Sequence, residues 1–134
     1  MKNIGKNLGL ISLMGFFLLL GGCAGSNGKT NSFDSTTRAY EQLIRWGDLE
    51  KTNDFLQKPA EFSAARHEKL KNIQVTSYRV LGRTITKEGI EQVVEIKYTK
   101  DASVVVRTLT DVQKWHYDEN DERWYLTSKI PQFK

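Results

Sequence analysis

The spacing of apolar residues changes near the middle of the chain. Before Ile73 they recur every three or four residues, as on one face of a helix, and after it every second residue, as on one face of a strand. Helical and strand patterns segregated in this way predict an α+β fold rather than the alternating units of a parallel sheet. We therefore expect two or three N-terminal helices packed on a curved four-stranded antiparallel sheet.

Three helical segments are expected before Ile73. Asp34 or Ser35 can cap the first, because a short side-chain oxygen accepts hydrogen bonds from the free amides of an opening turn. Gly47 interrupts this helix, and a short second helix follows it. Pro59 suits the first turn of a third, over residues 60–71.

Four strands joined by short polar turns are expected from Ile73 onward. In the first strand, the apolar residues before Ser77 and those after it fall on opposite faces. A β-bulge near Ser77 would bring both groups to one face. The turns are expected at residues 87–89, 100–102 and 118–121, and the last two strands over residues 104–117 and 123–128. Strands connected in this way form an antiparallel meander.

The first 22 residues have the pattern of a secretory leader. Lys2 and Lys6 precede an uncharged, mainly apolar run over residues 8–20. Such a run is too short to cross a bilayer of about 30 Å, which needs about 20 residues of helix. We expect residues 1–22 to be a signal peptide that is removed.

Cys23 is the only cysteine, and it follows the leader directly. The residues Leu20-Gly21-Gly22-Cys23 resemble the bacterial lipobox. This resemblance implies that the Cys23 thiol receives a diacylglycerol, that the leader is cleaved before it, and that the new amino terminus is acylated, as with palmitate. It implies a cell-envelope lipoprotein, on the periplasmic face of the outer membrane if the host has two membranes. The alternative is a buried or free thiol in an uncleaved helix.

Residues 23–33 are expected to be the lipidated cysteine and a flexible tether. Residues 24–32 are rich in Gly, Ser and Asn and nearly lack apolar side chains, so they cannot bury enough surface to offset their ordering entropy. A single folded domain is then expected over residues 34–134. After Lys2 and Lys6 leave with the leader, residues 23–134 carry 18 basic and 16 acidic side chains, and the two signs are interleaved. Nucleic acid would need a segregated basic face, so we expect no nucleic-acid partner.

Two segments of the domain resemble a known superfamily. The first helix leads into Gly47-Asp48-Leu49-Glu50, and the chain ends in a hairpin from Trp115-His116-Tyr117 to Trp124-Tyr125-Leu126. These features resemble the nuclear transport factor 2-like superfamily, whose members wrap a strongly bent sheet around a cone of helices. The superfamily includes isomerases, dehydratases and binding domains, and no catalytic motif transfers here residue by residue. The runner-up architecture is a three-stranded sheet on two helices, similar to small outer-membrane assembly lipoproteins.

No catalytic or metal-binding motif is present. His67 and His116 are the only histidines, and neither has a partner at metal-ligand spacing. His116 faces solvent if its neighbour Trp115 faces the core. The acids of residues 118–122 fit a hairpin turn better than a calcium loop. We therefore expect no metal and no cofactor, and we favour a non-enzymatic role over an enzymatic one.

Aromatic residues are the candidates for ligand or partner contact. They include Tyr78, Tyr98, Trp115, Trp124 and Tyr125. Such rings can fill a core, line a pocket for a small apolar ligand, or form an exposed patch from Trp115, Trp124 and Tyr125. Within the last strand, Trp124 is expected to face the core and Tyr125 the outside.

Two hypotheses about function follow. The first is a membrane-anchored envelope lipoprotein that acts as a non-enzymatic binding or interaction module, with an envelope protein or a small apolar ligand as its partner. The alternative is a pocket enzyme of the isomerase or dehydratase type. That enzyme would hold an acid/base residue, Asp111 or His116, beside Tyr78 or Tyr98 in a deep cavity.

Overall fold

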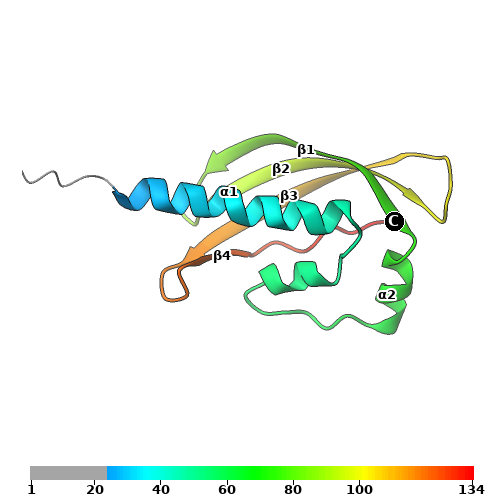
Figure 1. Ribbon diagram of the computed structural model, residues 1–134, viewed down its shortest axis with the longest axis horizontal. Helices are drawn as coiled ribbons and strands as arrows, with labels where there is room; N and C mark the ends of the chain where they lie inside the picture. The colour runs from blue at the N-terminus through cyan, green and yellow to red at the C-terminus, as the bar shows by residue number, and fades with distance from the viewer. Residues whose placement is uncertain (1–23) are drawn as a thin grey trace, which may run out of the picture.

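The computed structural model describes the backbone of residues 24–134 and the side chains of residues 28–134. Helices precede strands along the chain, which confirms the α+β class (Figure 1). The elements are α1 (Ala24–Arg45), the 3-10 helix η1 (Lys51–Phe55), α2 (Ala64–Leu70), β1 (Ile73–Ile85), β2 (Ile90–Lys100), β3 (Arg107–Asp118) and β4 (Arg123–Leu126).

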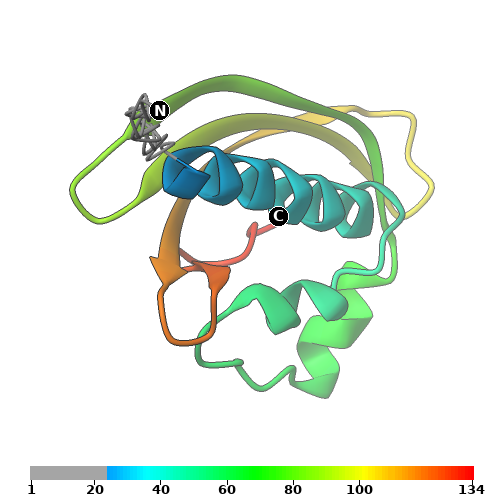
Figure 2. The same cartoon turned by 60° about the vertical axis from the view of Figure 1, so that its left-hand side comes forward.

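The four strands form one sheet in the order β1-β2-β3-β4, and each neighbouring pair is antiparallel. This arrangement is the expected meander. The three-stranded runner-up is wrong for the described part of the chain. Figure 2 shows β1 and β2 passing over one side of α1, so the core lies between this helix and the sheet.

The register of β1 shifts at two places. The first shift lies between Val75 and Ser77, at the predicted bulge, and it brings Tyr78 to the same buried side as Ile73. The second lies between Val80 and Gly82. Val80 pairs with a fully buried valine of β2 but remains 39% exposed, because β1 is an edge strand.

Helix α1 begins ten residues before the predicted start at Asp34, and it replaces most of the expected tether. Phe33 is 1% exposed, and its ring meets the rings of Trp124 and Trp115 edge-on at centroid distances of 5.0 and 6.2 Å. The indole Nε1 of Trp124 donates a hydrogen bond of 3.2 Å to the carbonyl oxygen of Lys29. These contacts with the sheet stabilise a helix that its composition alone does not favour.

The second and third helical segments also differ from the predictions. The second is the single 3-10 turn η1, and the third begins at Ala64 rather than after Pro59. Asn53 exchanges two hydrogen bonds of 2.8 Å with the backbone of Ala60, which holds the intervening chain as a loop. The hydroxyl of Ser63 then caps α2 by accepting from the amide of Arg66.

The last two strands are shorter than predicted, because β3 starts at Arg107 and β4 ends at Leu126. Asp101 and Ala102 both have left-handed backbone angles, with φ of 54° and 53°. The amide of Ser103 donates to the carbonyl of Lys100 at 3.0 Å, as in a type I′ turn. The next three residues, 104–106, are not paired with β2, and β3 begins after them.

Gly89 lies directly against β3, and its replacement is a test of this packing. A Cβ at Gly89 would lie 1.9 Å from the carbonyl oxygen of Trp115, and its φ of 147° is unfavourable for other residues. We expect Gly89→Ala to lower the free energy of unfolding by at least about 2 kcal/mol. Urea denaturation measures the change. The control is Gly82→Ala, where an added Cβ meets nothing within 4 Å. Similar losses in both variants would contradict the close approach of Gly89 to β3.

Candidate functional site

A hydrogen-bonded polar network lies inside the core, between α1 and the sheet. At its centre is Gln113, which is 0% exposed. Its Oε1 accepts from Gln92 Nε2 at 3.1 Å and from Trp115 Nε1 at 3.3 Å, and its Nε2 donates to the Tyr78 hydroxyl at 3.0 Å and to Asp111 Oδ2 at 2.9 Å. All four hydrogen-bonding positions of this amide are therefore used.

The strand register explains why these polar side chains meet. Asp111, Gln113 and Trp115 alternate along β3 and so point to the same face. The antiparallel pairing places Gln92 of β2 opposite Gln113, and a buried valine opposite Asp111. The network is therefore part of the core-facing side of the sheet rather than of a loop.

Arg83 connects this network to α1. Its Nε donates to Gln92 Oε1 at 2.6 Å, and its Nη1 donates to Asp34 Oδ1 at the same distance. Its guanidinium also lies 5.1 Å from the ring centroid of Phe33, a cation–π distance. One side chain thus joins β1, β2 and the first half of α1.

Asp111 is the buried carboxyl group of the site, with 8% of its surface exposed. Burial raises the pKa of this carboxyl above its usual value, and the hydrogen bond from Gln113 offsets part of the effect. Among the described side chains, no cation forms an ion pair with Asp111. The carboxyl therefore tends to hold its proton, as a general acid must.

Two phenols interact electrostatically with Asp111. Tyr40 of α1 is 0% exposed, and within the described part of the chain its hydroxyl has no hydrogen-bond partner. Burial first, and then the charge of Asp111, raises the pKa of Tyr40. The pKa of Tyr78 is also raised, chiefly by burial. Tyr40 and Tyr78 therefore stay protonated at neutral pH and can act as hydrogen-bond donors.

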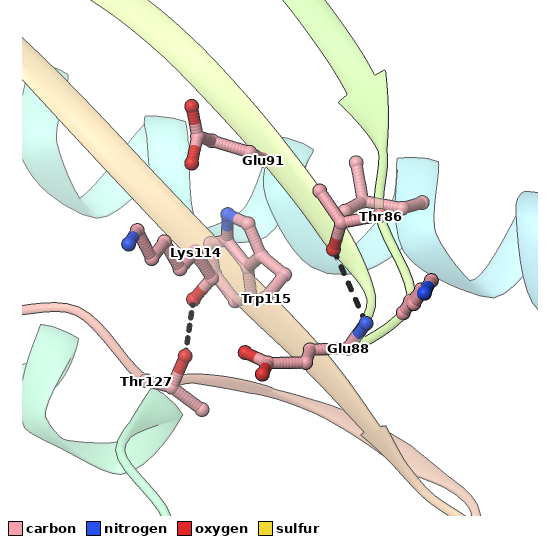
Figure 3. A pocket seen from close by; sticks show the side chains of 8 residues that line it. Thr86, Glu88, Glu91, Lys114, Trp115 and Thr127 are labelled. Atoms are coloured by element: carbon pink, nitrogen blue, oxygen red, sulfur yellow. Dashed lines mark hydrogen bonds between the residues drawn. The ribbon is translucent and has the colours of Figure 1, made fainter.

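A surface pocket of about 280 Å³ lies at the β1–β2 hairpin (Figure 3). It is lined by Thr86, Lys87, Glu88, Ile90, Glu91, Lys114, Trp115 and Thr127. Figure 3 shows the carboxylates of Glu88 and Glu91 on opposite sides of Trp115. The pocket is open and mixed in charge, and Asp111 does not line it.

Four of the five predicted contact residues are in the core. Tyr78, Tyr98, Trp115 and Trp124 are each at most 6% exposed. The hydroxyl of Tyr98 donates to the carbonyl of Lys134 and accepts from its amide, and its ring packs edge-on against Phe133 at 4.9 Å. The alternative of an exposed patch from Trp115, Trp124 and Tyr125 is wrong, because two of the three rings are buried.

The expected facing of the terminal hairpin is confirmed. Trp124 is buried, whereas Tyr125 is partly exposed and its hydroxyl donates to Asp121 Oδ2 at 2.6 Å. His116 is exposed, as expected from the burial of Trp115. In the turn before β4, Asp118 Oδ1 accepts from the amides of residues 120 and 121.

Within residues 24–134, no group of His, Cys, Asp or Glu side chains is arranged to hold a metal ion. No helix in this range is both long and apolar enough to span a membrane. The candidate lipidation site at Cys23 lies outside the described residues.

Sequence reasoning did not identify Tyr40, Gln92 and Gln113 as members of a site. The sequence could have indicated the two glutamines, because each lies at a position of its strand that faces the core. Gln92 alternates with Val94, and Gln113 with Trp115. A long amide at such a position needs buried partners, so two of them in facing strands predict a buried pair.

Comparisons with protein-family models, with curated proteins and with solved structures find no match for this chain.

The raised pKa of Asp111 predicts how stability depends on pH. Because the folded state binds this proton more tightly than the unfolded chain, stability is lost as the pH rises from the unfolded pKa, near 3.8, through the folded pKa. Asp111→Asn cannot ionise and keeps an oxygen for the Gln113 hydrogen bond. We compare the two proteins by the Tm of the variant minus the Tm of the wild type. We expect this difference to be smallest at about pH 3 and to increase with pH until it reaches a plateau.

Thermal unfolding from acidic to neutral pH measures this difference. The control is Asp54→Asn, which removes an exposed carboxyl and should give a difference that changes little over the same range. A variant that is less stable than the wild type at neutral pH would show that the ionised carboxylate stabilises the fold.

Proposed function

We propose that this protein is a membrane-anchored lipoprotein of the cell envelope whose domain is a non-enzymatic binding or interaction module. The residues Leu20-Gly21-Gly22-Cys23, after an apolar leader, support the anchor. Lipidation would then set the location, and the partner would be an envelope protein or a small apolar ligand.

One observation carries the assignment of a binding module. The face of the sheet beneath α1 is filled by aromatic rings and by the Gln113 network, whereas large apolar side chains are exposed elsewhere. Trp46 and Val104 are 84 and 94% exposed, and the segments that carry them lie at the same end of the molecule. Exposed apolar side chains that gather in one place tend to mark contact sites. The outer surface is therefore the better place for recognition.

We further propose that the fold is a cone of the nuclear transport factor 2-like type. The passage of β1 and β2 over α1 in Figure 2 supports a curved sheet. Gly47, with φ of 75°, ends the helical stretch, and a single bridge pairs Leu56 with Leu126 of β4. The bridge puts the residue after η1 beside the end of β4, and this supports a cone of helices wrapped by the sheet.

Metabolic labelling with radioactive palmitate tests the anchor. We expect the wild-type protein to incorporate the label and to fractionate with membranes. Cys23→Ala should lose the label, because the thioether to the diacylglycerol cannot form. Ser26→Ala, next to the same site, is the control that should keep it. Labelling that persists in Cys23→Ala would exclude the proposed anchor.

A second candidate function is favoured by Asp111 with Tyr40 and Tyr78. A buried carboxyl with a raised pKa, beside two phenols, is suited to proton transfer next to a carbonyl group, as in an isomerase or dehydratase. The unpartnered hydroxyl of Tyr40 is the group that a ligand oxygen would satisfy. This candidate requires the structure to open around Asp111, because only 8% of the surface of this residue is exposed.

Exchange of α-protons with solvent tests this second candidate. Small apolar ketones in D₂O, followed by NMR, should lose their α-protons faster with the wild type than with Asp111→Asn. We expect a difference of at least about 100-fold, the usual contribution of a general acid or base. Equal rates in the two proteins would reject the enzyme and leave the binding module.

A further inference from the structure

Four exposed apolar side chains belong to two segments at one end of the molecule. We call this group the apolar tip: Trp46, Val104, Val105 and Val106, with 84, 94, 60 and 54% of their surfaces exposed. Figures 1 and 2 show the end of α1 and the yellow loop between β2 and β3 at the same end, away from the start of α1.

Hydrogen bonds and a shared pocket support this placement. Trp46 lines a surface pocket with Ile73 and Gln74 at the start of β1. The amide of Asp101 donates to the carbonyl of Asn72 at 3.1 Å, so the loop after β2 also adjoins the start of β1. Both parts of the apolar tip therefore border the same end of the sheet.

The backbone holds these side chains outward. The type I′ turn at Asp101 and Ala102 fixes the start of the loop, and the hydroxyl of Ser103 accepts from the amide of Val105 at 3.1 Å. The amide of Trp46 donates to the carbonyl of Gln42, so its backbone continues the last turn of α1 while its ring lies in solvent. These side chains are therefore exposed because hydrogen-bonded backbone holds them outward.

Basic side chains flank the apolar tip. Residues 97–107 contain Lys97, Lys100 and Arg107 but a single acid, Asp101. Within the described part of the chain, none of these three cations forms an ion pair, and Arg107 donates only to the carbonyl of Lys134. The charge beside the exposed valines is therefore positive and open to an anionic partner.

This combination fits a lipid surface. Tryptophan is favoured at the boundary between lipid head groups and acyl chains, aliphatic side chains enter that boundary, and lysine and arginine remain at anionic head groups. A loop of three consecutive valines offers a small inserting group rather than the broad, shaped surface typical of a protein interface.

We propose that the apolar tip inserts into the surface of a bilayer that contains anionic lipids, while Lys97, Lys100 and Arg107 contact the head groups. This contact adds to the anchor proposed at Cys23 and does not require it. A 22-residue helix is about 33 Å long. If both contacts form on one membrane, α1 lies along its surface.

Trp46 is a natural reporter of this insertion, because Trp115 and Trp124 are only 1 and 6% exposed. The full-length protein is purified in detergent and reconstituted into phosphatidylcholine vesicles, with or without phosphatidylglycerol. Brominated acyl chains should quench Trp46 and shift its emission to the blue in the anionic vesicles, and less so in neutral vesicles or high salt. Trp46→Phe should abolish both changes, which identifies their source.

Val105→Asp is the variant that tests the role of the loop. A carboxylate at an anionic surface is both costly to desolvate and repelled, so we expect the ratio of inserted to free tip to fall at least about tenfold. Val112→Asp, on β3 and 43% exposed, is the matched control and should keep the quenching of the wild type.

Several results would overturn the proposal. In one such result, brominated lipid in anionic vesicles does not quench the fluorescence of Trp46, whereas iodide in solution still quenches it. Another is quenching that is equal in neutral vesicles and unchanged by salt. Protection that appears only after envelope proteins are added would make the tip a protein-docking surface instead. Palmitate labelling at Cys23 is measured separately, so failure of the anchor and failure of the tip are distinguishable.

Discussion

The fold depends on the packing of Trp115. Its ring meets Tyr40 of α1 edge-on at 5.3 Å and Phe55 of η1 at 6.2 Å, so it holds both against the sheet. Its indole nitrogen donates to Gln113, and its carbonyl oxygen lies where Gly89 passes in the neighbouring hairpin. A single residue of β3 therefore contacts the helix, the 3-10 turn, the polar network and the β1–β2 turn.

The strands could be predicted closely because their signal is local. The alternation of Val94, Ile96 and Tyr98 marks the buried face of β2, and the change of phase near Ser77 marks the first bulge of β1. Both follow from the two-residue repeat of a strand. The polar turn before β4 likewise contains its own cap, Asp118.

The start of α1 could not be predicted, because the contacts that stabilise it are distant in sequence. Phe33 is a lone apolar residue in a polar segment, and its partner Trp124 lies about ninety positions later. Composition measures only what a segment can bury by itself. The polar site was hidden for a related reason, since the partners of Gln113 come from three strands and become neighbours only once the register is known.

Several polar groups are buried in the interior, and several apolar groups are exposed on the surface. Inside, Asp111 and the hydroxyl of Tyr40 are withdrawn from water with few partners, although apolar residues would fit the same space at less cost. Outside, valines and a tryptophan are left in water. Both arrangements reduce the stability of the isolated domain, and proteins retain such features where function requires them.

The turn at Asp101 and Ala102 has a consequence for the thermodynamics of association. Two successive non-glycine residues with positive φ are uncommon, and each costs the folded chain about 1–2 kcal/mol relative to an ordinary conformation. In return, the loop has little conformational freedom left before it meets anything. Ordering a loop on contact subtracts from affinity, so a loop that is already ordered gives up less entropy when it binds. Its dissociation rate then reflects the contacts it makes rather than the refolding of the loop itself.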